Sequence, residues 1–142
     1  MSKLFIRAKS KLTYAEIAYH KFSEDDVFID DCCYFLQQCI ELTLKYLVEL
    51  HGEEYAENHE IRSNLNKLDR LGIEVPCVKE MRDMASTLYD WETKPRYNDD
   101  FVATKADIDD AFEIARQLVA YADTLITQQK NEPLPEFPDK KL

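Results

Sequence analysis

Hydrophobic residues recur along the chain every three or four positions, the spacing that places them on one face of an α-helix. From residue 3 to 22 this stripe consists of Phe5, Ala8, Leu12, Ala15, Tyr19 and Phe22. A second run, from residue 26 to 50, is apolar around so much of its girth that we expect it at the centre of the fold. No segment shows the period of two that is typical of a half-buried strand.

The same spacing predicts three further helices. A short helix carries Ile61, Leu65, Leu68 and Leu71 and ends at Gly72. The next is predicted to open at Val75-Pro76, because proline is tolerated in a first turn, and to reach about Trp91. After a loop, residues 92–103, the last helix is predicted from Thr104, with Asp107 as its capping partner, to about residue 128. The sequence therefore predicts an all-α, up-and-down antiparallel bundle of about five helices.

The length of 142 residues suits one domain. We expect the bundle to occupy residues 1–130. Residues 131–142 hold three prolines, so we expect a tail that is not helical and is mobile or extended.

Composition excludes several classes of protein. With only Gly52 and Gly72, the chain has no glycine-rich phosphate loop, and its net charge of −10 argues against binding of extended nucleic acid. The sequence contains neither a membrane-spanning stretch nor the apolar segment of a signal peptide, so we expect a cytoplasmic protein. Its four cysteines form no C-x-x-C pair and are expected to be reduced, mostly buried and apolar in role.

One polar stripe on the second helix carries candidate chemistry. Tyr34, Gln38, Glu41 and Lys45 are spaced by four, three and four residues and therefore share a face. This face is interpreted either as a solvated helix surface, where the Glu41–Lys45 pair would add only a few tenths of a kcal/mol, or as a polar groove at the bundle surface or a dimer interface.

A second cluster surrounds the turn after the fourth helix. Tyr89-Asp90-Trp91 is followed by Lys94-Pro95-Arg96-Tyr97, which gathers aromatic and cationic residues in an otherwise acidic chain. Arginine beside aromatic residues can bind a phosphate and stack on a base. The alternative is a structural clamp, in which Arg96 pairs with an acid and Tyr97 packs the loop. The three histidines show no metal-binding spacing, and no catalytic motif is present, so we expect neither a metal site, a cofactor nor an identifiable catalytic residue.

Several blocks, in order, resemble the HEPN domain (higher eukaryotes and prokaryotes nucleotide-binding). The first helix has the spaced small residues Ala8, Ala15 and Ala18, and the second has the pattern Phe35, Gln38, Glu41, Lys45 and then Gly52. His59 with Ile61 opens the third helix, Tyr89 and Arg96-Tyr97 follow the fourth, and Thr104 to Asp107 caps the last. The blocks span about residues 3–128.

This resemblance implies a helical bundle, commonly a homodimer, that is often the partner of a small nucleotidyltransferase in toxin–antitoxin-like pairs. One branch of the family cleaves RNA without a metal through Arg-x(4–6)-His. No arginine here is followed by histidine at that spacing, and Asn98 replaces the proline that many relatives have after Arg-Tyr. Histidine is the side chain best suited to proton transfer near neutral pH, so its absence argues against this activity.

Two functions from different classes follow. The first is a non-catalytic module that binds a nucleotide or a partner nucleotidyltransferase, with Arg96 and Lys45 on phosphate, Tyr97 stacking, and Gln38 and Glu41 as polar contacts. The second is a divergent metal-independent ribonuclease or toxin component, in which Arg96 would act with Glu41 or His59 brought close by folding. A third reading, a purely structural polar stripe, remains beside them.

Overall fold

The computed structural model describes residues 2–21, 27–94 and 103–131, and these ranges contain five helices and no strand. The helices are α1 (Lys3–Lys21), α2 (Val27–Leu50), α3 (Ile61–Arg70), α4 (Val78–Thr93) and α5 (Lys105–Asn131). The predicted all-α fold is therefore confirmed. Arg96, Tyr97 and the predicted tail beyond residue 131 lie outside the described residues.

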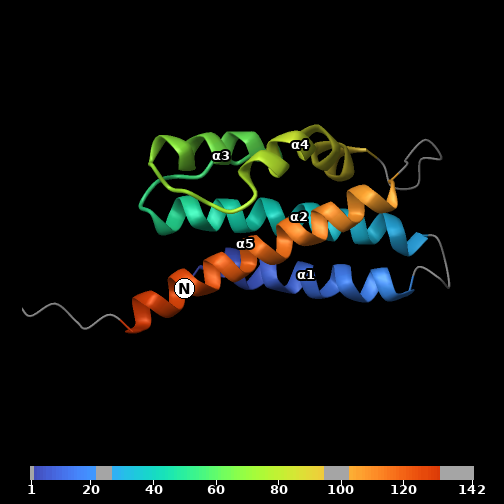
Figure 1. The fold of residues 1–142 in the computed structure, drawn as a ribbon, viewed down its shortest axis with the longest axis horizontal. Coiled ribbons are helices and arrows are strands. Elements are labelled where there is room, and N and C mark those ends of the chain that lie inside the picture. The colour runs from blue at the N-terminus through green and yellow to red at the C-terminus, as the bar shows by residue number, and fades with distance from the viewer. Residues whose placement is uncertain (1, 22–26, 95–102, 132–142) are drawn as a thin grey trace, which may run out of the picture.

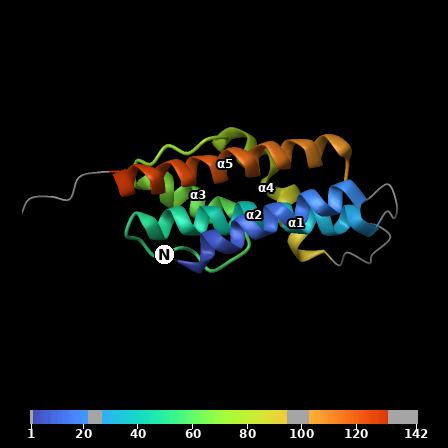
Figure 2. The ribbon, with the colours of Figure 1, turned by 90° about the horizontal axis from the view of Figure 1, so that it is seen from below.

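The chain runs up and down the length of the bundle (Figure 1). Helices α1 and α2 are antiparallel neighbours, and α3 and α4 both pack along α2. The chain reverses between α3 and α4, so that His59, just before α3, lies next to Glu92 in the last turn of α4. Helix α5 returns across the bundle. Figure 2 shows α5 lying above α1 and α2, and α5 contacts α1 through the Tyr19 and Phe112 rings, whose centroids are 5.5 Å apart. Helix α2 contacts all four other helices, as its broad apolar girth predicts.

The core is built around α2. Its Leu36, Ile40, Leu44 and Leu47 side chains are fully buried. Helix α1 adds Phe5, whose ring stacks on Tyr46 with centroids 5.0 Å apart. Each large apolar side chain buried in this way stabilises the fold by about 1.5–3 kcal/mol. Helix α2 is therefore held rigidly, which matters because it carries most of the candidate site.

Two helix starts test the predicted boundaries. Thr104 caps α5 as expected, since its hydroxyl accepts a hydrogen bond of 3.1 Å from the backbone N–H of Asp107. The predicted start of α4 is wrong by three residues, because Pro76 lies in a turn and the helix begins at Val78. Cys77 has a left-handed backbone (φ 63°), so a right-handed helix cannot pass through it and α4 begins only at the next residue.

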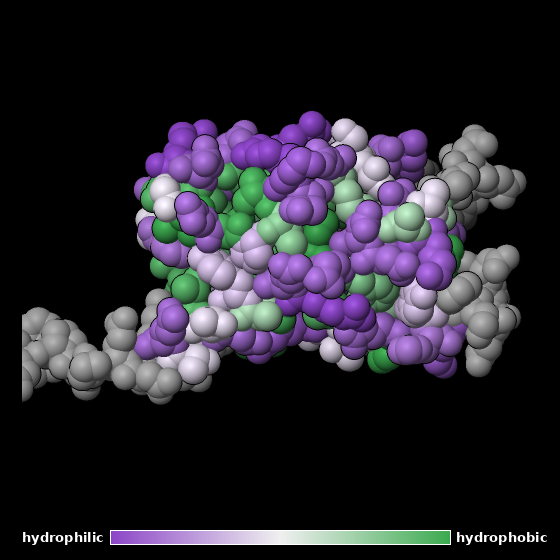
Figure 3. Space-filling view, in the orientation of Figure 1, coloured by the Kyte–Doolittle hydropathy of each residue, from purple (hydrophilic) through white to green (hydrophobic). Residues whose placement is uncertain are grey.

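All four cysteines are free thiols, and Cys32, Cys33 and Cys39 are buried while Cys77 is half-buried. The predicted apolar role is thus confirmed for the first three. Hydrophilic residues cover much of the face that Figure 3 shows, over α3, α4 and α5. Among the described residues, no helix combines the length and the apolar character that a membrane span requires.

Candidate functional site

Glu41, near the middle of α2, lies at the centre of a polar network. Its side chain is only 6% exposed, and a buried carboxylate needs compensating donors. Three side chains provide them: the Gln37 amide donates to Oε2 at 3.3 Å, and Lys45 Nζ and His59 Nδ1 lie 3.1 and 2.8 Å from Oε1. Because an ionised carboxylate only accepts hydrogen bonds, Nδ1 of His59 carries the proton in this contact.

The burial of Glu41 excludes the interpretation of its stripe as a solvated helix face. Lys45 is also largely buried, with 11% of its side chain exposed, and its ammonium lies 5.6 Å from the centroid of the Tyr55 ring. The pair predicted from the i, i+4 spacing is present. It is a largely desolvated pair, however, and not a weak surface pair.

The segment between α2 and α3 positions His59. Gly52 (φ 83°) allows the chain to turn out of α2. The buried Asn64 side chain then binds the Ala56 backbone twice, accepting from its N–H at 2.8 Å and donating to its carbonyl at 3.2 Å. Immediately after His59, Glu60 caps α3 by accepting from the Arg62 backbone N–H. His59 is therefore fixed on both sides along the chain, while its imidazole stays half-exposed, at 53%.

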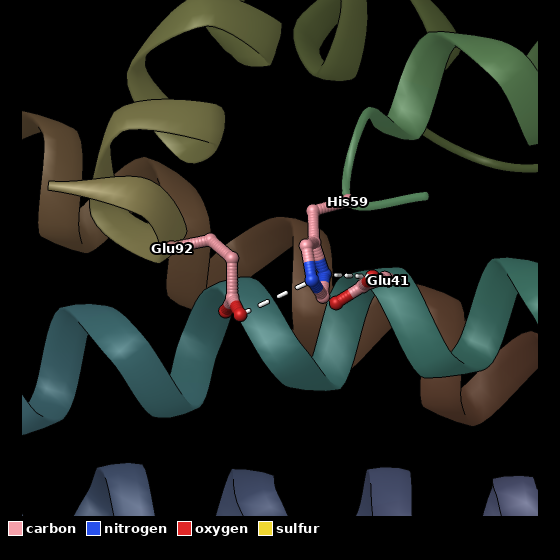
Figure 4. Close-up of side chains that lie close together, drawn as sticks. All are labelled: Glu41, His59 and Glu92. Atoms are coloured by element: carbon pink, nitrogen blue, oxygen red, sulfur yellow. Dashed lines mark hydrogen bonds and ion pairs between the residues drawn. The ribbon is translucent and has the colours of Figure 1, made fainter. Parts of the chain in front are cut away.

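Glu92, in the last turn of α4, completes the cluster. Its Oε1 lies 3.6 Å from Nδ1 of His59, so the imidazole stands between two carboxylates from different helices (Figure 4). One ligand-type atom from each of Glu41, His59 and Glu92 lies within 4.8 Å of the other two. We call these three residues, together with Lys45, the Glu41 cluster.

The structure brings together only part of the residue set predicted from the sequence. Glu41 and Lys45 meet, whereas Gln38 donates instead to the Tyr34 hydroxyl at 2.7 Å, one turn earlier on α2. Arg96 and Tyr97 fall outside the described residues, so their predicted roles stay predictions. The ribonuclease hypothesis needs Glu41 or His59 near Arg96. The structure places Glu41 and His59 next to each other, and Arg96 lies outside the described residues.

Sequence reasoning missed Glu92, a member of the cluster, and Gln37, which holds Glu41. Glu92 was expected to begin a loop, and no local pattern distinguishes it from the other acids of this chain. Gln37 lies one position before Gln38 of the predicted stripe, is fully buried and binds Glu41. The prediction that nothing here supports a metal site rested on spacing along the chain. It did not anticipate that three separate segments would converge.

This arrangement has definite chemical capacities. A carboxylate that accepts from one imidazole nitrogen fixes the ring and its tautomer and leaves the other nitrogen for proton exchange. Lys45 and protonated His59 can also present positive charge to an anion. The groups nearby limit its size, because Glu49, Glu53, Glu54 and Glu57 line a neighbouring cavity with Tyr55. A long polyanion would be repelled there.

Comparison with known proteins gives one positive result. No curated protein and no solved structure matches the chain. The family model for the HEPN domain matches residues 1–125, which is most of its length. The Glu41 cluster and all of the helical core up to Ala122 lie within that match. The chain belongs to the HEPN domain family.

Proposed function

We propose that this HEPN chain is a non-catalytic binding module that takes the phosphate of a small nucleotide at the Glu41 cluster. The observation that carries the proposal is the sharing of one buried oxygen, Glu41 Oε1, by Lys45 and His59. Two nitrogen donors held in this way lose little conformational freedom when a phosphate arrives. Charge-assisted hydrogen bonds to phosphate are among the stronger polar contacts in proteins.

The cluster alone does not carry enough positive charge for this role. Glu41 and Glu92 balance Lys45 and a protonated His59. Arg96 follows Glu92 by four residues in the sequence and would supply the missing charge, with Tyr97 available to stack on a base. We therefore assign the phosphate to Arg96, His59 and Lys45, and the base to Tyr97.

Isothermal titration with ATP, GTP and UTP, in buffer containing EDTA, tests the proposal. Replacing one charged donor should weaken binding by about tenfold or more, so we expect that loss for Arg96→Ala and for His59→Ala. Lys79→Ala is the matched control, because Lys79 is an exposed cation paired with Asp83 on the outer face of α4. The absence of heat with folded protein at millimolar nucleotide would overturn nucleotide binding.

The HEPN resemblance also suggests a protein partner, a nucleotidyltransferase encoded beside this chain. We propose this partner as a second ligand of the module. Co-expression of the two proteins, with a tag on the neighbouring protein only, should recover both in one complex. Recovery of the tagged protein alone would count against the pairing, and it would leave the nucleotide experiment unaffected.

One observation favours a second function, metal-independent RNA cleavage. The 2.8 Å contact between His59 Nδ1 and Glu41 Oε1 is the arrangement in which a carboxylate orients an imidazole for general acid–base work. Incubation with end-labelled RNA in EDTA decides between the two functions. Cleavage that is lost in both His59→Ala and Arg96→Ala, but kept in His20→Ala, would establish the nuclease. Intact RNA at high protein concentration would exclude it.

A further inference from the structure

We propose that Glu41, His59 and Glu92 form a binding site for one divalent first-row cation. The site uses the residues of the proposed function but does not require a nucleotide to be present. An imidazole and two carboxylates are a donor set that suits ions such as Mn²⁺, Fe²⁺ and Zn²⁺. The three donors come from the middle of α2, the residue before the α3 cap, and the last turn of α4, so the folded bundle creates the site (Figure 4).

Two of the three separations between the donor atoms are close to those around a single ion, and all three are within 4.8 Å. Ligands that each lie about 2.1 Å from a metal at tetrahedral angles are separated from one another by about 3.4 Å. The two separations from His59 Nδ1, 2.8 Å to Glu41 Oε1 and 3.6 Å to Glu92 Oε1, lie on either side of that value. The cation would take the place of the proton on Nδ1, and the side-chain tips would shift to complete its coordination.

The surroundings of Glu41 resemble those of a metal ligand that other residues hold in place. The side chain is more than nine-tenths buried, and the fully buried Gln37 amide fixes its second oxygen at 3.3 Å. Such outer contacts orient ligating carboxylates. Lys45 lies 3.1 Å from the ligating oxygen and offsets one of the two negative charges. We therefore expect Lys45 to move aside and the affinity to be moderate.

The half-exposed His59 gives the ion both an entrance and an open coordination position. Three protein ligands with a free position are the pattern of metal sites that also bind a substrate or a phosphate, whereas structural sites are closed by four. An ion here would add positive charge between two carboxylates. It would give a nucleotide phosphate a further contact.

Mn²⁺ is a better probe than Zn²⁺. It favours oxygen ligands and binds thiols weakly, whereas the cysteines of this chain could bind Zn²⁺. The metal-stripped chain is titrated with Mn²⁺ alone, and the free ion is measured by electron paramagnetic resonance. We expect one bound Mn²⁺ per chain. His59→Ala and Glu92→Gln should each weaken binding by about tenfold or more. His20→Ala, which removes an exposed histidine of α1, should bind as the wild type does.

A second measurement keeps the result independent of folding defects. Bound Mn²⁺ should raise the melting temperature of the wild type and of His20→Ala, and it should leave that of His59→Ala unchanged. Circular dichroism without metal confirms that each variant is folded. The proposal is overturned if the wild type binds no Mn²⁺ at millimolar concentration, or if His59→Ala and Glu92→Gln bind it unchanged. The latter result would place the ion on other acids, such as those that line the cavity beside Tyr55. Nucleotide binding in EDTA is judged separately, so either idea can fail alone.

Discussion

Glu41 shows how one residue can serve both stability and function. Its carboxylate is satisfied by three side chains, and removing it would leave Lys45 and the Gln37 amide buried without their acceptor. Breaking a buried, hydrogen-bonded charge pair in this way strongly destabilises the folded state. We expect Glu41→Ala to lower the free energy of unfolding by about 3 kcal/mol, measured by urea denaturation.

Lys79→Ala is the control for that measurement. Lys79 and Asp83 also form an i, i+4 pair, at 3.1 Å, but both side chains are mostly exposed. The loss there should stay below about 0.5 kcal/mol. Equal losses in the two variants would show that burial adds nothing to the Glu41 contacts.

The buried thiols make a prediction about pH. Burial raises the pKa of the Cys32 and Cys39 thiols to about 12, and it raises the pKa of Cys33 as well. Below the ordinary value of 9.0, both the folded and the unfolded chain keep these protons. Above it the unfolded chain loses them first, so stability should fall as the pH rises from 9 towards 12. Urea midpoints in reducing buffer should show this fall, and the fall should be smaller in Cys39→Ala. A parallel decline in both proteins would assign it to other groups.

At this scale the sequence predicts contacts within a helix and misses contacts between segments. The Glu41–Lys45 pair follows from a spacing of four, which every α-helix converts into proximity. His59 lies 18 positions from Glu41 in the sequence. Its position depends on the turn at Gly52 and on the hydrogen bonds between the Asn64 side chain and the Ala56 backbone. No periodicity encodes that path.

At the scale of the helices, single residues of the sequence can indicate where a helix ends. Gly52 and Gly72 were expected to end helices, and both have a positive φ, 83° and 72°. Cys77 adopts a similar backbone without being glycine, and for that reason the start of α4 was missed. Proline signals where a helix is able to begin. It does not reveal that the next residue turns the chain the other way.

The Gly72 position tests this reading of helix ends. An added Cβ there would meet nothing within 4 Å, so the cost of Gly72→Ala comes from the left-handed backbone alone. We expect a loss of about 1 kcal/mol in unfolding free energy by thermal or urea denaturation. Ser86→Ala, at an exposed position within α4, should be neutral or slightly stabilising. If Gly72→Ala were as stable as the wild type, the positive φ would not be what ends α3.

Among the described residues, an apolar groove lies between α1 and the first turns of α2. Its cavity of about 290 Å³ is lined by Tyr14, Ile17, Ala18, Lys21, Phe28, Asp31 and Phe35. Tyr14 and Ile17 are each 49% exposed, which is unusual for large apolar side chains that lie next to each other on one face. Lys21 and Asp31 give the groove one charge of each sign. A two-fold interface pairs a patch with itself, and this patch offers apolar side chains and charges of both signs for such a pairing.

We therefore expect a homodimer that is held through this groove, with Lys21 of each copy facing Asp31 of the other. Ile17→Lys would place an unpaired charge in the apolar contact, and it should convert the dimer into a monomer in sedimentation velocity experiments at micromolar concentration. Tyr89→Lys is the matched control, because Tyr89 is an exposed aromatic on α4, away from the groove. Its dimer should persist. A wild-type chain that sediments as a monomer would contradict the interface, as would an Ile17→Lys variant that remains dimeric.

The groove and the Glu41 cluster occupy different parts of the bundle. The Glu41 cluster lies on α2, on α4 and on the segment between α2 and α3, whereas the groove lies on α1 and the first turns of α2. Ile17→Lys should therefore abolish dimer formation and leave ligand binding unchanged.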